Sequence, residues 1–190
     1  MLTNFSSILI FNQMMIFLRN SVICVFLLLS SCEEANYVLD NPFDPENIDL
    51  KPPALFFHPP SINTIVDTSI SVELYGLELG PSAAAHLDIR YDWGSIIVDS
   101  VIPGPFFLGE NNPMEITVDE QGVLDIFLYY LPDMDSDQNE GGTWSLATVY
   151  FTTVSTGESE LLYGPNTVLR DANNDSVSIR EFGTGYVIVD

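Results

Sequence analysis

Cysteine and basic residues are scarce in this chain of 190 residues. It contains two cysteines, Cys24 and Cys32, and five lysines and arginines against 27 aspartates and glutamates. No cysteine follows Cys32, which excludes an internal disulfide, a thiolate enzyme and a cysteine-based zinc site in the rest of the chain. The negative charge repels nucleic acid and anionic lipid headgroups, so we expect no nucleic-acid partner and a basic or cationic complement.

Signs of catalysis are equally scarce. The only two histidines, His58 and His86, are too few for a histidine-based zinc site. The sequence has no Ser-His-Asp arrangement, no glycine-rich phosphate loop and no motif that marks out a pair of carboxylates. With so many acidic residues, some pair lies at glycosidase spacing by chance alone. We therefore expect a non-catalytic protein without a cofactor.

The first 31 residues lack acidic side chains and have the layout of a secretory signal. Arg19 is their single basic residue, and an unbroken apolar run covers residues 22–29. The sequence Leu-Ser-Ser-Cys that ends at Cys32 resembles the lipobox of bacterial lipoproteins, which implies that Cys32 is acylated and that residues 1–31 are removed as a signal peptide. The two glutamates after it resemble the acidic stretch that sends some lipoproteins outward. We expect an exported protein, lipid-anchored at the outer membrane or cell surface.

The alternative is a transmembrane helix over residues 8–29, a stretch long enough to span a bilayer. Such a helix would place Arg19 in the middle of the membrane, at a cost of about 2.5 to 3.5 kcal/mol. That cost favours the lipoprotein signal, so that only the lipid anchor would meet the membrane.

Residues 32–53 show turn signals in place of a strand or helix pattern. Asn41-Pro42 and Asp44-Pro45 are turn dipeptides, and Pro52-Pro53 stands just before the first strand-like run. We predict the lipidated cysteine and a flexible tether over residues 32–53, followed by a single domain over residues 54–190.

From residue 54 on, short runs alternate apolar and polar residues and are separated by Gly, Pro, Asn and Asp. No stretch shows the period of an amphipathic helix. The runs cover residues 55–57, 69–74, 86–91, 96–101, 115–119, 123–130, 143–154, 160–163, 167–170, 177–180 and 186–189. This spacing predicts an all-β sandwich of about ten to eleven strands.

Several short motifs follow one another along this domain. They are Leu-Asp-Ile-Arg-Tyr-Asp at 87–92, Ile-Ile-Val-Asp-Ser-Val at 96–101, a glycine-led apolar strand at 122–128, Leu-Ala-Thr-Val-Tyr-Phe at 146–151, and Val-Ser-Ile at 177–179. Their order resembles that of cohesin domains, which hold dockerin-bearing partners. The resemblance covers nearly all of residues 54–190. It implies a nine-stranded jelly-roll-type β-sandwich and a role in protein–protein interaction.

The resemblance also points to one strand as a binding surface. In cohesins that bind dockerins, exposed polar residues of the strand ending in Tyr-Asp help to hold the partner. Here those positions fall on Ala84 and His86, where the family usually has Asn and Asp. We predict that an outer sheet face binds a protein partner, dockerin-like in the simplest case, through Ala84, His86, Asp88, Arg90 and Tyr130.

Aromatic residues support a second interpretation, in which the domain binds polysaccharide. Tyr129, Tyr130 and Trp144 offer planar rings of the kind that stack on sugars. Strand alternation places only one of the two tyrosines outward. Trp144, at the start of a strand, is more often a residue at the rim of a core.

Three aspartates at alternate positions, Asp133, Asp135 and Asp137, resemble the spacing of a calcium loop. The EF-hand pattern fails, because Gln138 stands where a glycine is needed and Trp144 where a bidentate glutamate belongs. These aspartates remain a weak calcium candidate. The alternative interpretation is a solvated acidic loop between strands. Residues 171–175, Asp-Ala-Asn-Asn-Asp, have a similar spacing of oxygen-bearing side chains and also fail the EF-hand pattern. They predict a β-turn.

Overall fold

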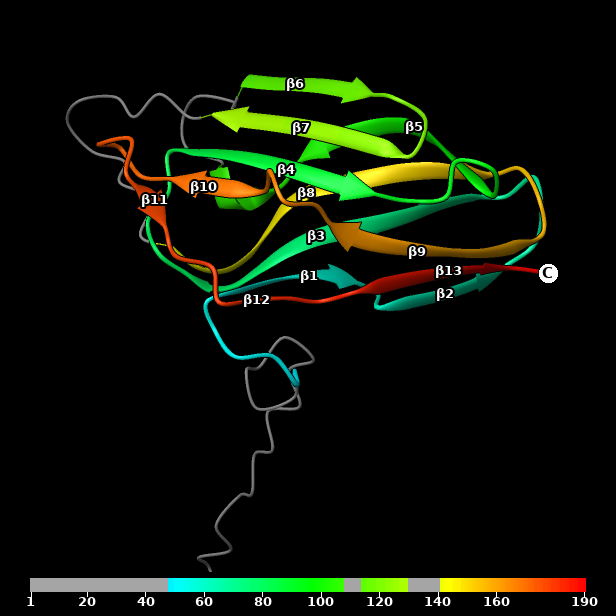
Figure 1. Cartoon of the computed structure of the whole chain (residues 1–190), viewed down its shortest axis with the longest axis horizontal. Helices are drawn as coiled ribbons and strands as arrows, with labels where there is room; N and C mark the ends of the chain where they lie inside the picture. Colours follow the sequence, from blue (N-terminus) through cyan, green and yellow to red (C-terminus); the bar gives the residue numbers. More distant parts are fainter. Residues whose placement is uncertain (1–47, 108–113, 130–140) are drawn as a thin grey trace, which may run out of the picture. The chain divides into compact units, whose positions relative to one another are not determined.

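The computed structural model describes residues 48–107, 114–129 and 141–190, and these are mostly β-strand (Figure 1). The strands are β1 (Ala54–His58), β2 (Ser61–Thr64), β3 (Ser69–Leu79), β4 (Ala84–Arg90), β5 (Ile96–Pro103), β6 (Met114–Asp119), β7 (Val123–Tyr129), β8 (Gly142–Thr153), β9 (Gly157–Tyr163), β10 (Val168–Arg170), β11 (Ser176–Val177), β12 (Glu181–Phe182) and β13 (Gly185–Val189). One 3-10 turn, η1 (Pro105–Phe107), follows β5. The all-β class predicted from the alternating runs is confirmed.

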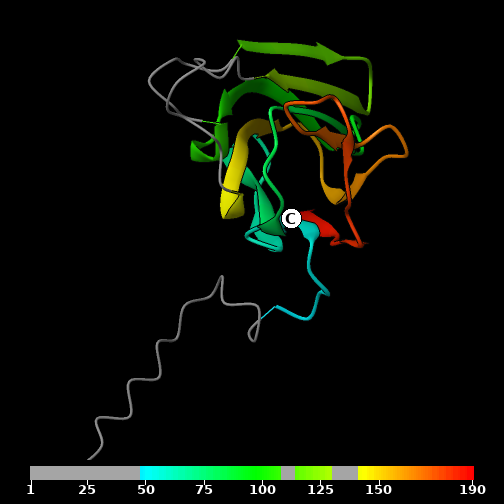
Figure 2. The ribbon, with the colours of Figure 1, turned by 90° about the vertical axis from the view of Figure 1, so that its left-hand side faces the viewer.

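The strands form two sheets that face each other across the core (Figures 1 and 2). The five-stranded sheet has the order β12-β1-β3-β8-β5. The eight-stranded sheet has the order β11-β10-β4-β9-β13-β2, and β7 and β6 extend it from β4. One edge of β4 pairs with β10 at residues 84–86 and with β9 at residues 89–90, while its other edge pairs with β7 along its whole length.

The hydrophobic core is made by the inward residue of each alternating pair. Typical members are Leu87 and Ile89 on β4, and Val149 and Phe151 on β8, all of them at most 1% exposed. Truncating such a side chain to alanine costs about 2 to 5 kcal/mol. Because neighbouring residues on a strand point to opposite sides, burying this row leaves the alternate row on the outer face.

The described residues contain thirteen strand segments, whereas the resemblance implied nine strands. Several of the additional segments are short: β10, β11 and β12 have two or three residues each. Most of the run predicted over residues 177–180 lies between β11 and β12, outside both strands, where the chain passes from the eight-stranded sheet to the five-stranded one. Two-residue segments carry too little alternation to be recognised in a sequence.

The described chain begins on the outer face of the five-stranded sheet, which we call the back face. Ala54 and Phe56 point to this side, because Leu55 and Phe57 between and after them lie in the core. Together with Leu77 they form a second apolar cluster, against which Ile48 and Leu50 pack. Residues 48–51, which we call the strap, thus belong to the folded domain although the sequence predicted a tether up to residue 53.

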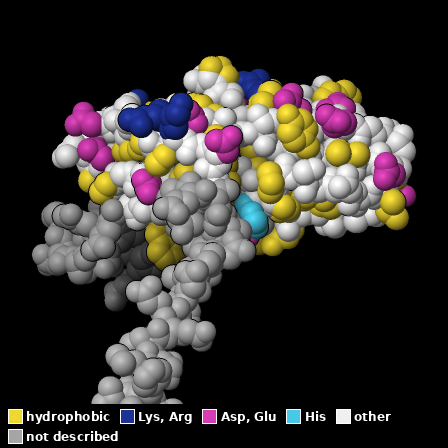
Figure 3. Space-filling view, turned by 90° about the horizontal axis from the view of Figure 1, so that it is seen from below, with side chains coloured by type: hydrophobic (Ala, Val, Ile, Leu, Met, Phe, Trp, Pro, Cys, Tyr) yellow, Lys and Arg dark blue, Asp and Glu magenta, His cyan; other side chains and the backbone are white. Residues whose placement is uncertain are grey.

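Acidic side chains are spread among apolar and uncharged ones over the surface seen in Figure 3. Within the described residues, no helix is of sufficient length and hydropathy to cross a membrane. The signal segment 1–31 and its transmembrane alternative, the lipidation site Cys32 and the tether up to residue 47 fall outside those residues, as do Tyr130 and the calcium candidates Asp133, Asp135 and Asp137.

Candidate functional site

Four of the predicted contact residues lie on one row of β4. Ala84, His86, Asp88 and Arg90 alternate with residues of the core, so they are on the outer side of the eight-stranded sheet. This strand lies between β7 on one edge and β10 and β9 on the other. The row is therefore inside the sheet, and neighbouring strands supply further side chains to the same surface.

Strand register shows which side chains share this surface. His86 is opposite Phe127 on β7 and Val168 on β10, and Phe127 is opposite Ile116 on the outermost strand β6. Residues directly opposite each other on paired strands point to the same side of the sheet. We call this surface the front face; its members are Ile116, Val118, Val123, Asp125, Phe127, Tyr129, Ala84, His86, Asp88, Arg90, Val168 and Arg170.

Most of the front face is apolar. Ile116 and Val118 are 48% and 42% exposed, and Val123, Phe127 and Val168 are half-buried. β6 pairs only with β7 among the described strands, so Ile116 and Val118 lie on the open edge strand of the sheet. Apolar side chains clustered on one outer face are typical of an interaction surface.

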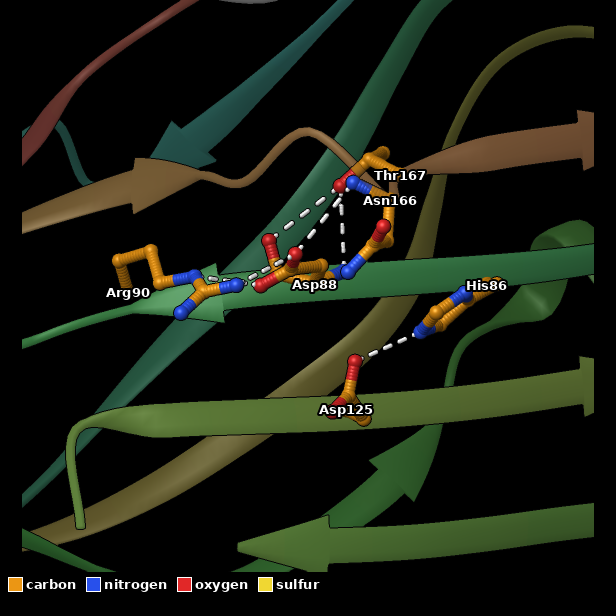
Figure 4. A network of polar contacts seen from close by, with 6 residues as sticks. All are labelled: His86, Asp88, Arg90, Asp125, Asn166 and Thr167. Atoms are coloured by element: carbon orange, nitrogen blue, oxygen red, sulfur yellow. Dashed lines mark hydrogen bonds and ion pairs between the residues drawn. The ribbon is translucent and has the colours of Figure 1, made fainter. Parts of the chain in front are cut away.

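A histidine–carboxylate pair lies at the centre of the front face (Figure 4). His86 Nε2 is 2.6 Å from Asp125 Oδ1, and both side chains are about a quarter exposed, at 23% and 27%. The imidazole ring also stacks on Phe127, with the ring centroids 4.2 Å apart and the planes inclined by 16°. The hydrogen bond and the stacking together fix the orientation of His86 on the surface.

Asp88 requires a correction, because it was predicted to be an exposed contact residue and the structure buries it completely. Its position in β4 falls between the segments paired with β10 and β9, and residues 164–167, which join those strands, cover it there. Gly164 N–H donates to the Asp88 carbonyl at 2.6 Å, and Asp88 N–H donates to Thr167 Oγ1 at 3.1 Å. A Cβ at position 164 would collide with the carboxyl group, which explains the glycine.

The buried carboxylate of Asp88 is neutralised by Arg90 (Figure 4). Arg90 Nε is 2.7 Å from Asp88 Oδ1, Arg90 Nη2 donates to Oδ2 at 2.9 Å, and the Asn166 N–H donates to Oδ2 at 3.3 Å. The hydrogen bond to Asp88 raises the pKa of the Arg90 guanidinium, so the group stays charged. Asp88 thus supports the front face from within, and the 40% exposed Arg90 side chain is what a partner would meet.

The aromatic residues considered for sugar stacking lie on different sheets. Tyr129 is half-buried on the front face, whereas Trp144 lies near the start of β8 in the five-stranded sheet, opposite Gly76 of β3. Trp144 is 53% exposed, more than a residue of the core rim would be. Trp93, in the turn after β4, is 52% exposed and escaped the sequence analysis because it belongs to no alternating run.

No group of three or more histidine, cysteine or acidic side chains that could hold a metal ion occurs in the described parts of the chain. The turn predicted at residues 171–175 is confirmed: Asp171 Oδ1 accepts hydrogen bonds from the N–H groups of Asn173 and Asp175, at 2.8 and 2.9 Å. The Asp171 carboxylate therefore accepts hydrogen bonds from the backbone of its own turn.

The contribution of β6 and β7 to the front face was missed by sequence reasoning. The alternation of Val123, Asp125, Phe127 and Tyr129 was recognised as a strand, but nothing local indicated that this strand is the neighbour of β4. Pairing between strands 30 or more residues apart depends on the whole topology. The available signal was that both runs alternate and that the run at 123–129 has apolar residues on both of its faces.

Comparisons with known proteins find similarity in the fold, and not in the sequence. No family model matches the chain, and no curated protein sequence matches it. Among solved structures, the chain is similar to a non-cellulosomal cohesin of the archaeon Archaeoglobus fulgidus, with a TM-score of 0.58 and 15% identity over 72% of this chain and 90% of that one. The domain has a cohesin fold. The resemblance predicted from the order of motifs is confirmed at this level.

Two further cohesin structures give the same result. The sixth cohesin of scaffoldin B from Acetivibrio cellulolyticus, solved in complex with a Cel5 dockerin, has a TM-score of 0.59 and 14% identity over 72% of this chain and 98% of that one. The seventh type I cohesin of scaffoldin B from Pseudobacteroides cellulosolvens has a TM-score of 0.58 and 18% identity, covering 72% and 91%. At such identities the shared property is the cohesin fold.

Proposed function

We propose that this protein is a non-catalytic binding module that holds a protein partner on its front face. The observation that carries the proposal is the apolar four-strand surface with the His86–Asp125 pair at its centre. The Acetivibrio cohesin of the same fold is described in complex with a dockerin, which supports a dockerin-like partner. Ala84 and His86 stand at the positions that the resemblance assigns to partner binding.

The partner's chemistry follows from the surface. Its own face must be apolar to cover Ile116, Val118 and Phe127, because burying such side chains is the main favourable term in association. The 27 acidic residues of the chain favour a partner whose rim is basic, since complementary charge speeds encounter and excludes acidic competitors. Arg90 and Arg170 add two positively charged side chains to the front face.

The proposal includes an anchor. We infer from the sequence ending at Cys32 that the mature chain is exported and attached to the outer membrane or cell surface through acyl chains on that cysteine. A partner would thereby be held at the cell. One acyl chain binds membranes only marginally, whereas two or three give lasting attachment.

A matched pair of variants tests the binding surface. Ile116→Asp places a charge on the front face, and Ile102→Asp places one on β5 of the other sheet; the two side chains are 48% and 52% exposed. Proteins of the producing cell are first captured on the wild-type domain and the recovered partner is titrated. We expect Ile116→Asp to weaken its binding at least about tenfold, or 1.4 kcal/mol, and Ile102→Asp to leave it unchanged. Equal weakening by both variants contradicts the proposal.

A second candidate function is polysaccharide binding, and the exposure of Trp144 favours it. A tryptophan ring that is 53% exposed on a sheet is suited to stacking on a sugar. Affinity electrophoresis on cellulose, xylan, chitin and algal glycans separates the candidates. A mobility shift on one glycan that Trp144→Ala or Tyr130→Ala abolishes in a folded protein would favour this function over protein binding.

A further inference from the structure

The chain enters the domain on the side opposite the front face. The front face is the outer surface of the eight-stranded sheet, whereas the strap packs on the outer surface of the five-stranded sheet. The segment that begins at residue 48, cyan in Figures 1 and 2, lies across the sandwich from β6 and β7 in both views. Two sheets packed about 10 Å apart, with their outer side chains, separate the two surfaces by about 20 Å.

Several contacts fix the strap to the back face. Ile48 and Leu50 pack on the cluster of Ala54, Phe56 and Leu77. Lys51 N–H donates to Glu181 Oε2 at 2.8 Å, and Lys51 Nζ is 3.5 Å from Glu181 Oε1. The first of these contacts is the main cause of the lowered pKa of the Glu181 carboxyl. The apolar packing and the backbone hydrogen bond hold the strap at a defined place.

The strap also shortens the free part of the chain. If Cys32 is the anchor, residues 33–47 remain between the acylated residue and the strap, in place of residues 33–53. If residues 33–47 form the flexible tether that the sequence predicts, a chain of this length has a root-mean-square span of about 20 Å. That span is similar to the distance from the back face to the front face, so turning the front face to the membrane would require a tether stretched beyond its average.

We propose that the strap orients the anchored domain, with its back face towards the membrane and its front face towards a partner outside. This arrangement rests on the anchor in the proposed function, but not on the identity of the partner. It acts through the attachment point together with the short free chain: a chain joined to the back face keeps that face nearer the membrane as long as its span does not exceed the thickness of the domain. The partner then needs no room between the domain and the lipid.

The orientation can be measured with two single-cysteine variants of the lipidated protein. Ser71→Cys lies on the back face, since it is exposed and precedes the core residue Val72, and Val118→Cys lies on the front face. In the mature protein the acylated Cys32 cannot react, so a thiol-reactive fluorophore labels only the introduced residue. Each labelled protein is placed in phosphatidylcholine vesicles that carry a quencher on their headgroups.

We expect quenching at position 71 to exceed that at position 118 by at least about twofold, because the tether spans roughly the thickness of the domain. A release variant, Ile48→Asp with Leu50→Asp, lengthens the free chain and should bring the two values together while the circular dichroism of the domain is retained. Equal quenching at both positions in the wild-type strap, or stronger quenching at position 118, overturns the proposal.

Mass spectrometry separates this result from the other proposals. A mature protein that begins at Cys32 and carries a diacylglyceryl group establishes the anchor, and Cys32→Ala should abolish both the acylation and vesicle binding. A mature protein without acyl chains overturns the orientation together with the anchor. Neither outcome affects the capture of a partner by the front face, which the Ile116→Asp variant tests in the unlipidated domain.

Discussion

At the scale of single residues, the buried Asp88–Arg90 pair is the most consequential feature. A carboxylate that is fully removed from water is costly unless it is paired and hydrogen-bonded. Asp88 accepts from Arg90 and from the Asn166 N–H, and its main chain is bonded to Gly164 and Thr167. One residue therefore joins β4, the 164–167 segment and a surface guanidinium.

Removing Arg90 should consequently destabilise the domain more than removing another arginine of the front face. Arg90→Ala leaves the Asp88 carboxylate buried without its cation, and we expect a loss of about 3 kcal/mol in the free energy of unfolding, the lower end for broken buried pairs, because the guanidinium is partly solvated. Arg170→Ala, which removes a single exposed hydrogen bond to the Asn174 carbonyl, should cost under about 1 kcal/mol. Urea denaturation measures both values.

The double variant Asp88→Asn with Arg90→Ala provides the control. If the cost arises from the unpaired charge, the double variant should be more stable than Arg90→Ala alone, since the amide removes the charge at nearly the same volume. The Asp88→Asn single variant is measured as well. A double variant whose loss of stability equals the sum of the losses in Asp88→Asn and Arg90→Ala would instead show that the two residues contribute independently.

At the scale of strands, the sequence predicts the long elements and fails where contacts are non-local. β3, β4 and β8 follow from their alternation, because a half-buried strand must place every second residue in the core. Asp88 has the same local pattern as an exposed residue, and only the passage of residues 164–167 over it explains its burial. The pattern along β4 contains no information about that segment.

The candidate site likewise contains residues that the sequence predicted and residues that it did not. His86 and Ala84 were found because they alternate with core residues along one strand. Ile116, Asp125 and Phe127 join them only through the pairing of β6, β7 and β4, which spans more than 30 residues of sequence. Strand pairing is decided by the fit of both sheet faces to the rest of the molecule, so single-strand patterns do not reveal it.

At the scale of the whole molecule, the sandwich separates two tasks onto its two outer surfaces. The back face accepts the incoming chain at the strap, and the front face carries the apolar surface with its His86–Asp125 pair. Between them no disulfide can strengthen the core, because no cysteine follows Cys32. The stability of this core can be followed through the tyrosines that border it.

Three tyrosines make the domain sensitive to alkaline pH. Burial raises the pKa of Tyr163, whose hydroxyl donates to the Phe56 carbonyl at 3.1 Å, and burial followed by the hydrogen bond to Asp119 raises the pKa of Tyr91. Burial, with Glu73 second, raises the pKa of Tyr75. In the unfolded chain a tyrosine ionises near pH 10. Each of these folded pKa values is higher, so the unfolded state loses its protons first.

These tyrosines should therefore leave the free energy of unfolding unchanged up to about pH 9.5 and lower it above pH 10, by up to about 1.4 kcal/mol per pH unit for each phenol that remains protonated only in the folded state. Urea midpoints and phenolate absorbance measure the two sides of this linkage. Tyr163→Phe should lower the stability at neutral pH by about 1 kcal/mol, through the lost hydrogen bond, yet make the alkaline decline shallower. Tyr186→Phe, at a 38% exposed position, should leave the decline unchanged. An identical decline in both variants would assign alkaline unfolding to the repulsion among the 27 acidic residues instead.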